Sequence, residues 1–258
     1  MKLFRHLTWE DSKPLFWFGI GAIGLILLDL GSKWLVERLV PLTTGPGIEV
    51  IPNFLYITKS YNVAIAFSLG STLPMQVGRG INIVISLVMS TAIVWYWILK
   101  DNTFGNKERV CAMLLASGAI GNLIDRAFYW MPITGFDGVI DFIQFYLGGG
   151  PSKGTSFINP FATFNLADSF LTIGIIYLIV LMVLDSIKEN VEAAKDTYLN
   201  WQKTKIGRDI NPDALTEFVR AAGGKRVVIT SPVFQRIPET SVAIDNTIEF
   251  VYGGVEDD

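Results

Sequence analysis

The chain has 258 residues and a net charge of −3; half of its residues are hydrophobic, only 17% are charged, and the mean hydropathy is +0.41. This composition is too apolar for an ordinary soluble domain, so it indicates a membrane protein and gives no reason to expect a nucleic-acid partner. One cysteine, Cys111, excludes an intrachain disulfide, and one histidine, His6, leaves no His and Cys cluster for a metal, so no metal or other cofactor is expected.

Four apolar segments are long enough to cross the hydrocarbon core of a membrane, which takes roughly 20 helical residues. They cover residues 15–36, 81–99, 110–128 and 166–184. The first follows a basic leader, residues 1–14, but it is too long for the apolar region of a cleaved signal peptide, so we expect it to be retained. The sequence therefore predicts a mainly α membrane protein with four transmembrane helices.

Lysine and arginine are unevenly distributed among the connections between these segments. The leader, the loop 100–109 and the start of the segment after the fourth span are rich in them, whereas 37–80 and 129–165 contain few. Because positively charged side chains resist translocation, the basic connections are expected in the cytoplasm. Both termini are then cytoplasmic, and residues 37–80 and 129–165 face outward.

The two outward connections are predicted to be structured. Residues 48–56 and 66–69 are aliphatic and aromatic stretches separated by Pro and Gly, which favours short strands in a small β-like cradle on the membrane surface. Residues 129–165 mix aromatic side chains with Gly and Pro, which is typical of a surface helix or loop in the headgroup region.

The chain becomes polar beyond the fourth span. Residues 187–205 have helical spacing, and 226–230 and 241–252 resemble strands, so we expect a small soluble cytoplasmic tail. The predicted parts are a leader, a membrane domain and this tail, at residues 1–14, 15–186 and 187–258.

Ionisable side chains gather at the outer ends of the predicted spans, although such groups are costly in a membrane. Asp29 and Lys33 are four residues apart, so they lie on one helical face and are expected to form a structural ion pair. Asp125 is interpreted as a scaffold residue held by the adjacent guanidinium of Arg126.

Two further acids lie near the same boundary. Asp168 opens the fourth span, where it has either a catalytic role or the role of a helix cap. Asp141 lies in an apolar run without a neighbouring base, which is hard to explain as scaffold. Two carboxylates within a few Å cannot both ionise, so one keeps a proton while the other accepts one from water. Such a pair can hydrolyse an amide without a covalent intermediate.

Four ordered motifs carry a family resemblance over roughly residues 15–185. They are the Asp-Leu-Gly-Ser-Lys of 29–33, the Gly-Asn-Leu-Ile-Asp-Arg of 121–126, the Val-Ile-Asp-Phe of 139–142 and the Phe-Asn-Leu-Ala-Asp-Ser of 164–169. In this order they resemble the lipoprotein signal peptidases, the signal peptidase II family of bacterial membrane aspartyl proteases.

The resemblance implies Asp141 and Asp168 as the catalytic pair. It further implies a set of residues that support the site or bind substrate: Asn62, Asn122, Asp125, Arg126, Asn165, Asp29 and Lys33. The implied substrate is a prolipoprotein whose cysteine carries diacylglycerol and which is cut on the N-terminal side of that cysteine. The implied location is the bacterial inner membrane, with the site at the outer face and a monomer surrounded by membrane lipid.

The sequence departs from the family pattern in two places. Ala64 and Ile65 stand where the motif beginning at Asn62 usually has Gly and Ala, and the intervals before and after Asp141 are longer than in compact members. The added bulk and length predict altered outer loops.

Two other classes of function fit a chain with four spans. A small proton- or cation-coupled transporter would use membrane carboxylates as relays, but it predicts acids near the bilayer centre and helices broken by Gly or Pro. A scaffold that recruits partners through its tail would leave the outer motifs without a role. Cleavage of a lipidated precursor distinguishes the three.

Overall fold

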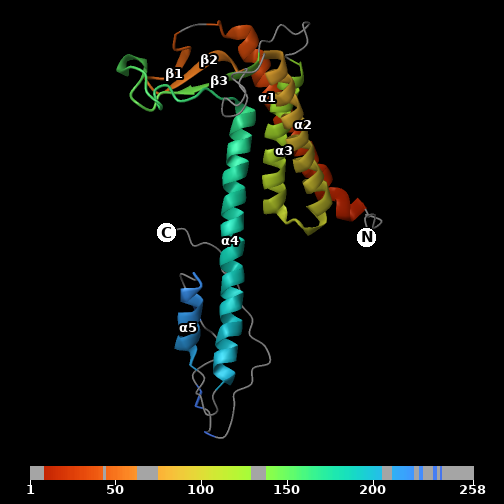
Figure 1. Cartoon of the computed structure of the whole chain (residues 1–258), viewed down its shortest axis with the longest axis vertical. Coiled ribbons are helices and arrows are strands. Elements are labelled where there is room, and N and C mark those ends of the chain that lie inside the picture. Colours follow the sequence, from red (N-terminus) through yellow and green to blue (C-terminus); the bar gives the residue numbers. More distant parts are fainter. Residues whose placement is uncertain are drawn as a thin grey trace. The chain divides into compact units, whose positions relative to one another are not determined.

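A computed structural model describes residues 9–42, 45–62, 75–128, 138–204, 211–223, 227–228, 235–236 and 239 (Figure 1). Within these residues, four helices are long and apolar enough to cross a membrane. They are α1 (Trp9–Leu39), α2 (Met75–Lys100), α3 (Asn106–Phe128) and α4 (Leu166–Lys203). The predicted class, a mainly α protein with four transmembrane helices, is confirmed.

The helices extend beyond the apolar segments that predicted them. α1 begins at Trp9 and includes Pro14, and α4 continues to Lys203 instead of ending near residue 184. A helix satisfies its backbone hydrogen bonds internally, so it does not need to end where the apolar composition ends. The polar stretch 187–203, predicted to be helical, therefore forms one helix with the fourth span.

A three-stranded antiparallel sheet lies at the end of the helices where α4 begins (Figure 1). Its strands are β1 (Ile48–Ile51), β2 (Leu55–Asn62) and β3 (Val139–Phe145), in the order β1-β2-β3. β1 and β2 confirm the strand prediction for residues 48–56. The predicted strands at 66–69 and 241–252 lie outside the described residues, as does most of that at 226–230.

Within the outer segment 129–165, expected as a surface helix or loop, residues Val139–Phe145 instead form the strand β3, whereas the described residues that follow it are mainly loop. The strand pairs with β2 from Leu55–Phe145 to Asn62–Val139. Its residues from Val139 to Phe142 are all buried, so the sequence lacks the alternating pattern that marks a half-buried strand. Ile140 and Phe142 pack with Val36 and Val40 in one apolar cluster, which fixes the sheet to the end of α1.

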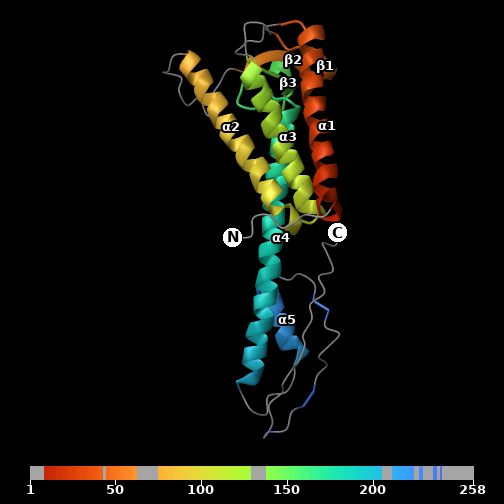
Figure 2. The same cartoon turned by 90° about the vertical axis from the view of Figure 1, so that its right-hand side faces the viewer.

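Small residues bring α3 close to both α1 and α4. A methyl group added at Gly121 would stand 2.7 Å from the Asp29 carboxylate of α1 and 3.1 Å from Ala167 of α4. One added at Gly118 would stand 2.9 Å from the backbone nitrogen of Leu171. This close approach lets polar side chains of three helices meet. Figure 2 shows that α2 behaves differently: its last turns lie close to α3, and its first turns lie far from α3.

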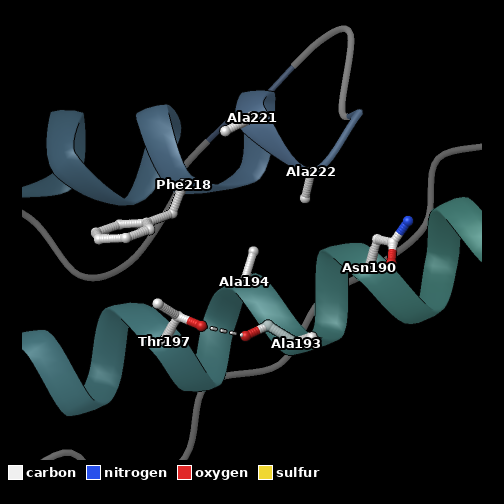
Figure 3. A pocket seen from close by; sticks show the side chains of 7 residues that line it. All are labelled: Asn190, Ala193, Ala194, Thr197, Phe218, Ala221 and Ala222. Atoms are coloured by element: carbon white, nitrogen blue, oxygen red, sulfur yellow. Dashed lines mark hydrogen bonds between the residues drawn. The ribbon is translucent and has the colours of Figure 1, made fainter.

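The chain forms two compact units, residues 1–178 and 179–258, so α4 contributes to both. In the second unit, α5 (Pro212–Ala221) begins with an Asn211 cap whose side chain accepts a hydrogen bond from Asp213 N at 2.9 Å. An aromatic cluster holds α5 on α4; its members are Tyr198, Trp201 and Phe218. Beside it, alanines of both helices line an open groove (Figure 3). The predicted tail boundary at residue 187 stays a prediction.

Candidate functional site

Asp141 projects from the middle of β3, where it is 3% exposed. Both of its carboxylate oxygens accept hydrogen bonds from asparagine side chains. Asn165 Nδ2 donates to Oδ1 at 2.7 Å, and Asn62 Nδ2 donates to Oδ2 at 2.9 Å. Asn62 is the last residue of β2, so the pairing of β2 with β3 brings this amide to the carboxylate.

Asp168 lies in the first turn of α4 and is partly exposed. Its Oδ2 accepts a hydrogen bond from Asn165 N at 3.2 Å, and Asn165 Oδ1 accepts one from Asp168 N at 2.9 Å. This reciprocal pair is a capping box, so the interpretation of Asp168 as part of a helix cap is correct. The other oxygen, Oδ1, accepts a hydrogen bond from Asn122 Nδ2 of α3 at 2.7 Å.

Asn165 connects the two acids. It is completely buried, and it donates to Asp141 with its side chain and to Asp168 with its backbone. Its side-chain nitrogen also lies 3.3 Å from Asn122 Oδ1. The two acids, 27 positions apart in the sequence, therefore meet at one asparagine.

The surroundings of Asp141 favour its neutral form. Burial raises the pKa of Asp141 to about 6, and the charge of Asp168 acts in the same direction. Hydrogen bonds from Asn62 and Asn165 and the positive charge of Lys33 oppose this rise in pKa. This carboxyl group therefore keeps its proton to a higher pH than an exposed aspartate does.

A buried lysine joins α1 to α3. Lys33 Nζ lies 2.7 Å from Asp29 Oδ2, which confirms the predicted ion pair, and 2.7 Å from Asp125 Oδ2. It also lies 3.4 Å from Asn122 Oδ1. Asp29 Oδ1 accepts a hydrogen bond from Ala167 N at 2.9 Å, so α1 directly caps the first turn of α4.

The expectation that the Arg126 guanidinium holds Asp125 is wrong. Asp125 pairs with Lys33, whereas Arg126 Nη1 donates to Ser86 Oγ of α2 at 2.8 Å. Adjacent residues of a helix point in different directions, so Asp125 faces α1 while Arg126 faces α2.

Sequence reasoning missed the polar face of α2. Asn82, Ser86 and Ser90 are buried and recur every four residues, so they lie along one side of this helix. That spacing in an otherwise apolar segment was the available signal. It also missed Glu37, whose carboxylate accepts a hydrogen bond from Tyr61 OH at 2.7 Å and ties the end of β2 to α1 beside Asn62.

Comparison with known proteins places these residues in a family. The profile of the family described as Signal peptidase (SPase) II matches residues 21–184. A lipoprotein signal peptidase of Staphylococcus epidermidis is 33% identical over 166 residues, which are 64% of this chain and 88% of that protein. One of Staphylococcus aureus is 29% identical over 174 residues, which are 67% of this chain and 92% of that protein.

Solved structures agree. A bacterial membrane enzyme determined by the in meso method at 2.3 Å resolution has 30% identity and a TM-score of 0.50, over 65% of this chain and 88% of that one. A second bacterial membrane enzyme, determined by the same method at 1.9 Å resolution, has 28% identity and a TM-score of 0.50, over 69% of this chain and 97% of that one. The family match covers the helices and motifs that form the site, so the peptidase interpretation prevails over the transporter. The chain belongs to the signal peptidase II family and is a multi-pass lipoprotein signal peptidase.

Proposed function

We propose that this lipoprotein signal peptidase is an aspartic endopeptidase whose catalytic residues are Asp141 and Asp168. The observation that carries the proposal is the convergence of both carboxylates on Asn165, which binds Asp141 Oδ1 and Asp168 Oδ2. Neutral amides hold both carboxyl groups. Among the ion pairs of the described residues, none joins Asp141 or Asp168 to a lysine or arginine. The two acids therefore remain free to share a proton.

The two acids have different tasks in this proposal. Asp141 holds the proton, because burial and the charge of Asp168 raise its pKa. Asp168 acts as the base, and the N–H groups of Asn122 and Asn165 stabilise its negative charge. Its place in the first turn of α4 adds the positive end of the helix dipole.

Hydrolysis then proceeds through a water molecule. Asp168 takes a proton from the water molecule, and the water oxygen attacks the carbonyl carbon of the substrate. At the same time, Asp141 donates a hydrogen bond to the carbonyl oxygen. The C–N bond breaks, its electron pair stays on nitrogen, and the pair of acids supplies the proton that completes the amine. One proton enters the pair from water and one leaves with the amine, so the pair ends with the single proton it started with.

The remaining predicted site residues support this geometry. Asn62 and Asn122 each hold one carboxylate by a hydrogen bond. A second group joins α1, α2 and α3 to one another and to the start of α4, which carries Asp168; its members are Asp29, Lys33, Asp125 and Arg126.

The family and the topology together suggest the substrate and its approach. Relatives named lipoprotein signal peptidase lead us to propose prolipoproteins with a diacylglyceryl cysteine as substrates, cut on the N-terminal side of that cysteine. Basic connections put both termini in the cytoplasm and the acids at the outer face of the bacterial inner membrane. A site at the helix ends suits a substrate that is anchored in the same membrane. Because one chain supplies all the proposed site residues, we propose that the enzyme acts as a monomer.

The experiment is cleavage of a lipidated precursor by purified Asp141→Asn and Asp168→Asn variants. Each should be slower by a factor of roughly 10² to 10⁴, because an amide cannot exchange the required proton. Asp185→Asn is the matched control, since Asp185 is an exposed acid on the same helix as Asp168. It should cleave normally. A correctly inserted Asp141→Asn or Asp168→Asn protein with normal turnover would exclude that residue from catalysis.

A further inference from the structure

The segment between β3 and α4 exposes two large apolar side chains at the tip of a turn. Phe157 is 91% exposed and Ile158 is 43% exposed. Residues 147–161 are called the Phe157 loop here. They belong to the interval of 26 residues between Asp141 and Asp168.

The exposure of this tip is built into the backbone of the loop. Asn159 is 2% exposed, and its side chain donates to Gly150 O at 3.0 Å and Gly154 O at 2.7 Å. Ser156 and Asn159 exchange backbone hydrogen bonds of 3.0 and 3.1 Å across the turn. Gly150 and Gly154 have φ of 97° and 80°, values that favour glycine. The loop is therefore organised from within and still leaves its largest apolar side chains outside.

The Phe157 loop continues an exposed apolar surface of the sheet. Tyr146 N, just before the loop, donates to Phe54 O at 2.8 Å, so the loop lies next to the turn between β1 and β2. On that turn and strand, four apolar side chains are 40% to 53% exposed: Ile48, Val50, Ile51 and Phe54. Large apolar side chains that are exposed together on neighbouring segments mark a contact site.

The position and the charge of this surface favour lipid as its occupant. Figure 1 shows the sheet, with β1 and β2 in orange and β3 in green, and the green loop that follows β3 projecting sideways from the ends of the helices instead of continuing along their axes. In a membrane that arrangement lies over the lipid beside the helices. Residues 142–167 contain no Asp or Glu and one basic residue, Lys153, which suits negatively charged headgroups. On the adjoining β1, the acid Glu49 accepts hydrogen bonds from Asn53 N and Tyr56 OH.

We propose that the Phe157 loop is a membrane anchor that inserts Phe157 and Ile158 into the leaflet at which α4 begins, with Lys153 at the headgroup phosphates. Aromatic and aliphatic side chains bind at this depth, and a nearby basic residue adds attraction to anionic lipid. The anchor would hold the sheet, and with it Asp141, at a fixed height above the lipid. The proposal rests on the four spanning helices and does not depend on the identity of the catalytic residues.

The test places a spin label at residue 157 of the full-length protein in vesicles of phosphatidylcholine and phosphatidylglycerol. Cys111 is the only cysteine and is buried, so Phe157→Cys is made in a Cys111→Ser background. Ser152→Cys is the matched control, since Ser152 is an exposed polar residue of the same loop. The label at 157 should collide more with oxygen than with a water-soluble nickel chelate, and the label at 152 should show the reverse.

Three results would overturn the proposal. Equal access of the nickel chelate to both sites would put the tip in water. Dipolar broadening between labels at 157 would assign the surface to a second copy of the chain. Protection of site 157 only after addition of a lipidated precursor would assign it to the substrate.

Lys153→Gln should reduce the difference between the two sites on vesicles with phosphatidylglycerol, but not on phosphatidylcholine alone.

Discussion

Asn165 shows that a structural role and a catalytic role can belong to one motif. The same side chain caps α4 through its oxygen and binds the Asp141 carboxylate through its nitrogen. The interpretations of Asp168 as part of a helix cap and as a proposed catalytic residue are therefore compatible, because the capping box orients its carboxylate. An Asn at the helix start followed by an Asp three residues later encodes both.

The pKa of Asp141 gives a prediction at this scale. If its protonated form is the active one, kcat/KM should fall as pH rises through about 6, with an apparent pKa that belongs to the pair of acids. Asn62 donates to the ionised carboxylate, so Asn62→Ala should raise that pKa and move the alkaline limb of the pH profile to higher pH.

Cleavage of a lipidated precursor across the pH range measures this shift. Asn190→Ala on the second compact unit should leave the profile unchanged. An alkaline limb that stays in place or moves to lower pH in Asn62→Ala would contradict the assignment of the proton to Asp141.

The motifs in the sequence contain most of the polar residues that converge in the candidate site, but their pairings could not be predicted. The motifs contain Asp29, Lys33, Asp125 and Arg126, and only the i, i+4 pair follows from helix geometry. The contact of Lys33 with Asp125 joins two helices, so it depends on the close approach allowed by small residues of α3. Local sequence cannot specify such a contact.

At the scale of elements, α1 holds the start of α4 through one buried cluster. Asp29 caps Ala167 N, and Lys33 holds both Asp29 and Asp125. Lys33→Met should leave two acids without their partner in a buried site, which costs about 3 to 5 kcal/mol of stability. Because the start of α4 also carries Asp168, activity should fall roughly a hundredfold at a temperature where the protein is still folded.

Thermal unfolding in detergent and precursor cleavage measure the two effects of Lys33→Met. Lys59→Met is the matched control, because Lys59 lies 3.7 Å from the Glu37 carboxylate and outside this cluster. It should lose far less stability and activity. Equal losses in the two lysine variants would show that the Lys33 cluster does not position α4.

The helices were easier to predict than the sheet for a physical reason. A span needs about 20 apolar residues, and that requirement leaves a plain signal in composition. β3 is short and buried on both sides of Asp141, so it has neither helical nor alternating periodicity. The strand forms because β2 offers an edge, which is a property of the assembled fold.

At the scale of the molecule, the proposed catalytic machinery lies in one compact unit. All of its residues fall between Asp29 and Asp168, within the unit of residues 1–178. The second unit has its own aromatic cluster around Tyr198 and Phe218. Truncation after Glu192 should therefore leave the cleavage rate of a lipidated precursor in detergent within a few-fold of that of the full chain. A truncated protein that is folded and inserted but inactive would show that the tail belongs to the catalytic unit.

The central claim is that Asp141 and Asp168 work as one catalytic unit. The most direct test is a comparison of precursor cleavage by the unmodified protein, Asp141→Asn, Asp168→Asn and the double variant, all in the same detergent. Groups that act together are not additive, so the double variant should be no slower than the slower single variant. Losses that multiply in the double variant, or one single variant that keeps normal turnover, would contradict a shared role for the two acids.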